Sequence, residues 1–399
     1  MTILYRIYQF ILYIVSPLLP WREPKVLKGV DALNQLHDEL MSRHIKHPLI
    51  VTDQGIVKSG ILDKVIESLG QDFLISVYEK TVPNPTIFQV EEAYVMYKEQ
   101  RCDAIIGLGG GSPIDASKCV GIRVAKPHVP LKNMKGILKV RKKLPLLIAI
   151  PTTAGTGSEA TLAAVISDPT TFEKFAISDM PLIPQIAVLD PKLTLGLPKF
   201  YTATTGMDAL THAIEAYIGK SNTRETKRRS LQAIETIHRY LKKAYDHPEN
   251  IEARMQMLQA SYDAGFAFTR AYVGNIHAIA HTFGGYYNIP HGYANAIIMP
   301  HVLTYYSHKV NRKLSEIYDV LYPDHKDDIQ TKAKHVISWI NDLNTYFNLP
   351  KTIEIPNKNY IHEMIQRAYQ EANPLYPVPV IFKKQDFEKL YQLVITKNP

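Results

Sequence analysis

The stretch CDAIIGLGGGSPIDASK, residues 102–118, decides the fold class. A short apolar run ends in Gly109, Gly110 and Gly111, which is typical of a strand buried on both faces that turns tightly into a helix. We predict that Ser112 is the N-cap of this helix, with Pro113 in its first turn. Glycine amides and a helix N-terminus together predict a site for a pyrophosphate, and a tight turn without a ligand is the alternative.

Similar elements lie on both sides of this stretch. Apolar runs predict further strands at 47–53, 72–78 and 144–150, and amphipathic segments predict helices near 55–70, 86–100 and 113–125. Alternating strands and helices predict a parallel sheet covered on both faces. The DPTT sequence at 168–171 predicts a hairpin turn, and helical patterns dominate from Thr202 onward. We therefore predict an apolar segment over 1–24, a Rossmann-like α/β domain over 25–197 and an all-α domain over 198–399.

The composition is that of an ordinary globular protein. The chain has 399 residues, of which 46% are hydrophobic and 21% charged, and a formal net charge of +8. This excludes collagen-like, disulfide-stapled and wholly disordered classes. The basic runs at 139–143 and 220–229 contain few aromatic residues, so we expect solvated surface and no nucleic-acid partner. Cys102 and Cys119 predict buried, reduced thiols and a cytoplasmic protein.

The N-terminal segment is apolar but short. Fifteen uncharged residues separate Arg6 from Arg22, and they include Pro17 and Pro20. A membrane-spanning helix needs about 20 apolar residues, so we predict a shorter helix that packs on the body of the protein or on a second copy. Peripheral contact of residues 1–20 with a membrane is the alternative.

Two further features suit a dinucleotide. The segment PTTAGTGSEAT, residues 151–161, follows a predicted strand and offers the hydroxyls of Thr152, Thr153 and Thr156. Open α/β sheets bind ligands at this end of their strands. Asp53 ends another strand, where a carboxylate can accept hydrogen bonds from ribose hydroxyls and repel a 2′-phosphate, which favours NAD over NADP. Helix capping is the alternative role for Asp53.

Histidines and one aspartate gather in two segments of the second half. Asp208 and His212 are four residues apart on a helical pattern, and His277 and His281 repeat that spacing before His291. One carboxylate and several imidazoles form a ligand set for a divalent metal. The HExxH pattern of a metalloprotease is absent from the sequence. Spacing leaves open which four of the five residues ligate, and a structural role in the core is the alternative for each histidine.

These motifs resemble those of the iron-containing (group III) alcohol dehydrogenase family, within the dehydroquinate synthase-like superfamily. The matching motifs are GGGSPIDASK, PTTAGTGSE, DALTH, HAIAH and HGYANAI, in the family's order and spacing. The resemblance implies an α/β nucleotide-binding domain followed by an all-α domain.

The resemblance also implies roles for single residues. It implies that the metal ligands are Asp208, His212, His277 and His291. His281 then lies near the metal as a catalytic residue that orients the substrate or relays a proton, and Phe268 belongs to the substrate pocket. The implied cofactor-binding residues are Asp53, Asn84, Gly110, Gly111, Ser112, Asp115, Thr152, Thr153, Thr156 and Lys174.

The function implied by the resemblance is a metal-dependent alcohol dehydrogenase or aldehyde reductase. Fe²⁺ or Zn²⁺ would polarise the oxygen of a small alcohol or aldehyde, and NAD, or less readily NADP, would exchange the hydride. We expect a cytoplasmic homo-oligomer, a dimer. The alternatives are a metal-dependent lyase or cyclase of the dehydroquinate synthase type, polyol oxidation as in glycerol dehydrogenase, and a membrane-associated or scaffolding protein without enzyme activity.

Overall fold

The chain forms two compact units in a computed structural model that describes residues 2–171 and 173–396. The first, here called the helical unit, contains Met1–Leu19, Phe200–Lys242 and Phe266–Pro399. The second, the sheet unit, contains Pro20–Lys199 and Lys243–Gly265. The domain limits given above, after residues 24 and 197, stay predictions.

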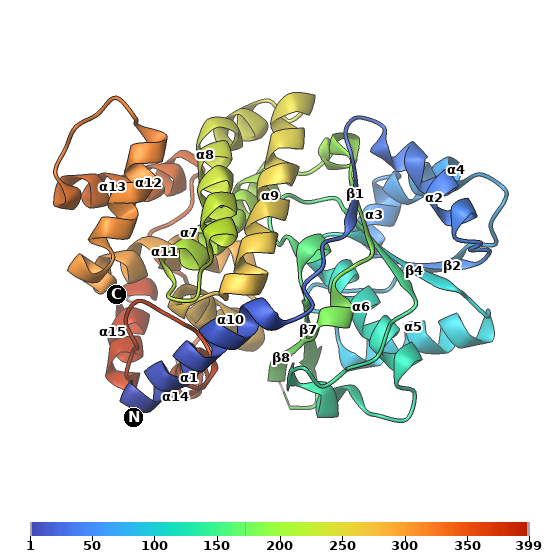
Figure 1. Cartoon of the computed structure of the whole chain (residues 1–399), viewed down its shortest axis with the longest axis horizontal. Helices are drawn as coiled ribbons and strands as arrows, with labels where there is room; N and C mark the ends of the chain where they lie inside the picture. The colour runs from blue at the N-terminus through green and yellow to red at the C-terminus, as the bar shows by residue number, and fades with distance from the viewer. Residues whose placement is uncertain (1, 172, 397–399) are drawn as a thin grey trace. The chain divides into compact units, whose positions relative to one another are not determined.

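A six-stranded sheet organises the sheet unit, with the strand order β1-β9-β6-β4-β2-β3 and parallel pairing throughout. Helices α2 and α4 lie on one side of it and α5 and α6 on the other (Figure 1). The strands of the unit are β1 (Lys25–Lys28), β2 (Pro48–Val51), β3 (Ser76–Tyr78), β4 (Ala104–Gly109), β5 (Gly136–Ile137), β6 (Leu146–Pro151), β7 (Ala163–Asp168), β8 (Glu173–Ser178) and β9 (Ile186–Leu189). Its helices are α2 (Gln35–Ser42), α3 (Gln54–Lys58), α4 (Ile61–Leu69), α5 (Ile87–Glu99) and α6 (Gly111–Ala125).

Strand β4 shows why this sheet needs continuous apolar runs. Ile105 belongs to the core cluster under α5 and α6, whereas Ile106 and Leu108 belong to the cluster under α2 and α4. Successive side chains of a strand point to opposite faces, so a sheet covered on both sides buries every residue. All six residues of β4 are buried, and the predicted parallel α/β architecture is confirmed.

Two local predictions need correction. The helix expected over 55–70 is two helices, α3 and α4, because Gly60 has a φ of 72° and breaks the helical path. The N-cap of α6 is Gly110 rather than Ser112, and the helix begins at Gly111. Gly109, with a φ of 141°, makes the turn early, so Ser112 and Pro113 both fall in the first helical turn. The amides of a first turn have no intrahelical acceptors, so a proline is tolerated there.

Other sequence expectations agree with the structure. The hairpin predicted at 168–171 joins β7 and β8, which pair antiparallel. Cys102 and Cys119 are buried free cysteines, as predicted. The apolar N-terminal segment forms helix α1 (Thr2–Val15) within the helical unit.

The rest of the helical unit consists of helices that pack on one another, among them α10 against α11 and α14. Helices α8 and α9 are each shared between the two units. Within the described residues, none of the helices has the length and apolar character needed to cross a membrane. The helices after the sheet are α7 (Lys199–Ile218), α8 (Arg224–Asp246), α9 (Ile251–Ala271), α10 (Asn275–Tyr287), α11 (His291–Tyr306), α12 (Asn311–Leu321), α13 (Ile329–Tyr346), α14 (Ile361–Ala372) and α15 (Lys384–Val394).

Candidate metal centre and cofactor-binding segments

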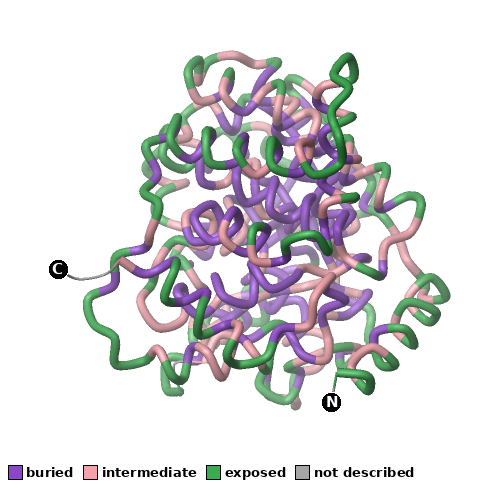
Figure 2. Tube along the Cα trace, turned by 90° about the vertical axis from the view of Figure 1, so that its left-hand side faces the viewer, coloured by how far each residue is buried: buried purple, intermediate pink, exposed green. Residues whose placement is uncertain are grey.

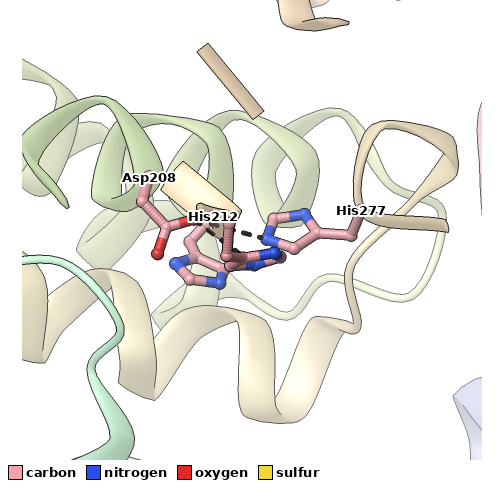
Figure 3. A group of neighbouring side chains, drawn as sticks. Asp208, His212 and His277 are labelled. Carbon is pink, nitrogen blue, oxygen red and sulfur yellow. Dashed lines mark ion pairs between the residues drawn. The ribbon is translucent and has the colours of Figure 1, made fainter. Parts of the chain in front are cut away.

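Four side chains from three helices converge in the helical unit. Asp208 and His212 lie one turn apart on α7, His277 lies on α10, and His291 is the first residue of α11. One ligand atom from each of the four lies within 4.8 Å of the others. Figure 3 shows Asp208, His212 and His277 pointing toward one another from their helices. The four residues that the resemblance implied as ligands are therefore the four that the fold brings together.

The donor set fits a divalent metal such as Fe²⁺ or Zn²⁺. Oδ1 of Asp208 lies 3.9 Å from Nε2 of His277 and 3.6 Å from Nε2 of His291. The rings of His212 and His277 stack with centroids 4.4 Å apart. Three imidazoles and one carboxylate are the nitrogen and oxygen donors that these metals accept.

Gly292 brings α11 close enough to complete this cluster. A Cβ atom at this position would lie 2.3 Å from the backbone oxygen of Thr204 and 3.2 Å from Cβ of Asp208. No side chain fits in that space, so only glycine lets the start of α11 approach α7. The glycine after His291 in the HGYANAI motif is thus a packing requirement of the centre.

Glu215 contacts His277 at Nδ1, the ring nitrogen that does not face Asp208. Its carboxylate is buried, accepts hydrogen bonds from the amides of Gly274 and Ile276, both at 2.8 Å, and lies 2.6 Å from Nδ1 of His277. Burial raises the pKa of Glu215 to about 7, and burial followed by the charge of His281 lowers the pKa of His277 well below its usual value. With Nδ1–H donated to Glu215, the lone pair of a neutral His277 is on Nε2, which faces Asp208.

Asn295 contacts three of the four converging side chains. Its side-chain amide donates to Oδ1 of Asp208 at 2.7 Å and lies 3.2 Å from Nε2 of His277 and 3.1 Å from Nε2 of His291. Asn295 is fully buried on α11, one turn after His291. It keeps the carboxylate and two imidazoles at hydrogen-bonding distance from a single group.

His281 lies beside the four converging side chains. Its ring stacks on His291 with centroids 5.0 Å apart, and its Nδ1 lies 2.5 Å from Oε1 of Glu371 on α14. The hydroxyl of Tyr376 donates to the same Glu371 oxygen at 2.8 Å. Burial raises the pKa of Glu371, but the charge and hydrogen bond of His281 and the hydrogen bond of Tyr376 outweigh it, so the pKa is lowered. An ionised Glu371 therefore faces His281.

Phe268 also contacts the ligand cluster. Its ring stacks on His212 with centroids 4.1 Å apart and an interplanar angle of 14°. An aromatic face on the His212 imidazole limits the room for polar groups next to it.

Two predicted cofactor-binding segments contact each other in the sheet unit. They are the glycine turn, residues 109–111, and the segment that carries Thr152, Thr153 and Thr156. A Cβ atom on Gly111 would lie 2.8 Å from Cγ2 of Thr156, and one on Gly110 would lie 3.4 Å from Cγ2 of Thr153. The amide of Thr152 donates to the backbone oxygen of Gly109 at 2.9 Å. Both segments follow neighbouring strands, β4 and β6, so their approach is a direct result of the strand order.

Asp53 lies at the same end of the sheet. Its Oδ1 accepts from the amides of Gly55 at 2.8 Å and Ile56 at 3.1 Å, which makes it the N-cap of α3. A Cβ atom on Gly109 would lie 3.4 Å from Oδ2 of Asp53. Asp53 therefore caps α3 through Oδ1, as the alternative interpretation predicted. Its other carboxylate oxygen, Oδ2, lies beside the glycine turn.

Asp115 is engaged with the protein itself. Its two oxygens accept from the hydroxyl of Ser158 at 2.5 Å and from the amide of Val165 at 2.9 Å. The ammonium of Lys118, which is fully buried, lies 3.8 Å away. These contacts tie α6 to the segment after β6 and to strand β7.

Asn84, Lys174 and Ser112, the remaining residues of the predicted cofactor set, also lie in the sheet unit. Lys174 on β8 donates to the side-chain oxygen of Asn84 at 2.8 Å. Ser112 is half-buried in the first turn of α6.

Family models match almost the whole chain. The model described as iron-containing alcohol dehydrogenase matches residues 23–191, and the C-terminal model of the Fe-containing alcohol dehydrogenase family matches residues 202–395. The chain belongs to the iron-containing alcohol dehydrogenase family, as the sequence motifs predicted. It is an oxidoreductase of the alcohol dehydrogenase class.

Curated relatives and solved structures agree. The chain is 36% identical over 373 residues to the NAD-dependent methanol dehydrogenase of Bacillus methanolicus, covering 90% of this chain and 97% of that one. It is 39% identical over 280 residues to the 1,3-propanediol dehydrogenase of Klebsiella pneumoniae, covering 69% and 72% of the two chains. A crystal structure of 1,3-propanediol oxidoreductase superimposes with a TM-score of 0.89, 31% identity, and coverage of 94% and 99%. The predicted cofactor classes, iron and NAD, are those of the family and of its NAD-dependent relative.

Three residues of the centre were missed by the sequence reasoning. Glu215 follows Asp208 and His212 at a spacing that continues the same helical face, and Asn295 follows His291 by one turn. Helical spacing could have found both. Glu371 has no such signal, because it lies 90 residues from His281 in the sequence.

Proposed function

We propose that this chain oxidises small alcohols with NAD⁺ and reduces the corresponding aldehydes with NADH. In this proposal Asp208, His212, His277 and His291 hold one divalent iron. The observation that carries the proposal is the convergence of these four side chains to within 4.8 Å. A divalent iron bound there supplies Lewis-acid polarisation of the alcohol or carbonyl oxygen.

The protein prepares the ligands for a cation in two ways. Asp208 contributes a carboxylate, and Asn295 fixes its orientation by a hydrogen bond of 2.7 Å. Glu215 fixes the tautomer of His277, so that Nε2 is available as a donor. Both effects reduce the rearrangement that metal binding requires.

We assign the proton transfer to His281. Alcohol oxidation releases a hydroxyl proton, and Nε2 of His281 can accept it because Nδ1 is held by Glu371. The ionised Glu371 stabilises the imidazolium that forms, and Tyr376 holds Glu371 in position. In the reducing direction Nε2 returns the proton to the oxygen of the product.

We assign the binding of NAD to the glycine turn and the segments beside it. The free amides at the N-terminus of α6 suit a pyrophosphate, and the hydroxyls of Thr153 and Thr156 lie against the same turn. In this proposal Asp53 selects NAD over NADP through its Oδ2, and the closeness of that oxygen to Gly109 supports the role. The nicotinamide supplies the hydride acceptor when bound. The NAD-dependent methanol dehydrogenase relative supports this choice of cofactor.

Turnover and metal content together test this proposal. Protein purified without oxygen is analysed for iron and zinc, then incubated with NAD⁺ and a panel of short alcohols and diols. We expect iron and the absorbance of reduced nicotinamide to appear together, and both to vanish after chelation. Turnover that survives complete removal of the metal would contradict the proposal. Zinc in place of iron, with full activity, would contradict the choice of metal alone.

We further propose a cytoplasmic homodimer. The two buried, reduced cysteines support a reducing compartment. Strand β1 stands at one edge of the six-stranded sheet, and an edge strand offers backbone groups that a second copy can pair. The mass of the protein in solution tests the assembly.

A further inference from the structure

The N-terminal helix α1 packs with its polar side inward. Arg6, its one charged residue, donates to the backbone oxygens of Val378 and Pro379 at 2.7 and 2.9 Å. Gln9 is the buried residue of the helix and donates to the backbone oxygens of Pro374 and Tyr376 at 3.1 and 2.7 Å. The polar side chains that would normally face water are thus used to attach α1 to segment 374–379.

The apolar side chains of α1 consequently face outward. Ile3 is 76% exposed, Leu4 66% and Phe10 60%. Figure 2 shows the trace beside the N-terminus mostly in the colour of exposed residues. We call the set on the side opposite Gln9 the α1 face; its members are Ile3, Leu4, Ile7, Tyr8, Phe10, Ile11, Ile14 and Val15. Tyr13, which is 41% exposed, lies outside this face, on the side of Arg6.

The α1 face is one continuous surface. At 3.6 residues per turn these eight residues cover an arc of about 160°, and Gln9 lies opposite its centre. Tyr8 and Phe10 lie at its two margins, while the aliphatic residues Ile7 and Ile11 lie in the middle. An apolar face of this width on a water-exposed helix is the inverse of the usual arrangement, and such faces indicate an interaction site.

Cations lie beside the covered side of α1. The backbone amide of Lys220 donates to the backbone oxygen of Pro377 at 2.7 Å, next to the carbonyls that Arg6 and Gln9 contact. Burial lowers the pKa of Lys220, and the charges of Arg6 and Lys309 lower it further. The ammonium of Lys384 lies 5.8 Å from the ring of Tyr369, whose hydroxyl is hydrogen-bonded to Tyr5 of α1. Lys220, Lys309 and Lys384 are all exposed. The sequence before Glu23 contains two arginines and no acidic residue.

We propose that the α1 face binds a lipid surface rich in anionic headgroups. The 14-residue helix rises about 21 Å, less than the hydrocarbon core of about 30 Å, so it lies in the plane of the interface. The aliphatic side chains enter the boundary between headgroups and acyl chains, and the flanking lysines contact the anionic headgroups. The enzyme is thereby held at the membrane surface, where alcohols and aldehydes of low polarity partition.

The same charges disfavour a second copy of the chain as the occupant. A two-fold contact places the same surface patch of both copies against each other. Lys220, Lys309 and Lys384 of one copy would then approach those of the other, and like charges repel. An anionic lipid surface pairs with these lysines instead.

Vesicle sedimentation tests the proposal with the full-length protein. Vesicles of phosphatidylcholine with phosphatidylserine are compared with vesicles of phosphatidylcholine alone. We expect binding to the anionic vesicles that weakens as salt is added. Phe10→Glu and Leu4→Glu should each reduce that binding at least tenfold. Deletion of α1 is less suitable, because it also removes the contacts of Arg6 and Gln9 with segment 374–379.

The chain offers matched controls in the sheet unit. Phe88 is 57% exposed and Leu74 is 71% exposed, close to the values of Phe10 and Leu4. Phe88→Glu and Leu74→Glu should leave vesicle binding unchanged, and all four variants should keep the alcohol dehydrogenase activity. Failure of the proposed function would appear as inactive wild-type protein, whatever the vesicle result.

Three results would overturn the proposal. Wild-type protein that stays in solution with both vesicle types shows that the α1 face does not bind lipid. Equal binding to neutral vesicles shows that the lysines contribute nothing. A fall in solution mass on Phe10→Glu, without vesicle binding by the wild type, shows that a second copy covers the face.

Discussion

Replacing Glu215 by glutamine should weaken metal binding although residue 215 contacts no metal. The carboxylate accepts from the amide of Gly274 and from Nδ1 of His277 through Oε2, and from the amide of Ile276 through Oε1. Gly274 can approach this closely only as glycine, because a Cβ atom there would lie 2.5 Å from Oε1. Three donors and a tight turn therefore depend on one carboxylate.

The magnitude follows from the two ways in which glutamine can fit. With its oxygen in place of Oε2, glutamine keeps Gly274 and His277 but turns its NH₂ group toward the amide of Ile276. With its oxygen in place of Oε1, it loses two donors. The first orientation costs less, since it leaves only the Ile276 amide without an acceptor. One unsatisfied buried amide lowers the free energy of unfolding by about 1–3 kcal/mol. His277 loses its negatively charged partner in both orientations, and losses of this kind weaken metal binding roughly 10- to 100-fold.

Chelator competition measures the metal affinity, and thermal unfolding of the metal-free protein measures the stability. Glu159→Gln is the matched control, because Glu159 is also buried, burial also raises its pKa to about 7, and it lies in the sheet unit. We expect Glu159→Gln to leave metal affinity unchanged. If Glu215→Gln binds metal as tightly as the wild type, Glu215 does not prepare His277 and the reasoning is refuted.

Three further predictions concern single side chains. His277→Ala and His291→Ala should each abolish metal retention and turnover together, since each removes one of four converging donors; normal metal content in either variant would show that the ligand assignment is wrong. Asp53→Gly should increase the use of NADP relative to NAD and cost a few tenths of a kcal/mol in stability. Asp328→Gly removes the equivalent cap of α13 and should change stability alone, so an unchanged NAD/NADP ratio in Asp53→Gly would exclude the selectivity role. Glu371→Gln should reduce turnover roughly tenfold or more while metal content stays normal, because His281 loses the carboxylate that stabilises its imidazolium; full activity would remove Glu371 from the mechanism.

The sequence predicted the main parts of the site because their signals are local. Asp208 and His212 share a helical face by spacing alone, and the three glycines after β4 mark a strand-to-helix turn. Local signals located the start of α6 less well. Ser112 is a good capping residue, but the glycines before it allow the chain to turn two residues earlier.

The sequence did not predict contacts between segments that are far apart in the chain. Glu371 lies 90 residues from His281 in the sequence. A glutamate in an amphipathic helix is normally expected to face solvent, and only the packing of α14 against α10 shows that Glu371 contacts His281. Asp115 is a second example, because its oxygens accept hydrogen bonds from Ser158, after β6, and from Val165 on β7. Its implied role in cofactor binding stays a prediction.

The amino-acid sequence by itself determined the class of fold and the family, and the family motifs indicated the four side chains that converge. Continuous apolar runs, glycine turns and helical spacing act over a few residues, and local sterics and burial decide them. Only the tertiary structure decided that α1 turns Arg6 and Gln9 inward and its apolar residues outward. An amphipathic pattern defines two faces of a helix, but the side that is covered depends on the groups offered by its neighbour. Here the neighbour is a run of backbone carbonyls in segment 374–379, which binds the polar face.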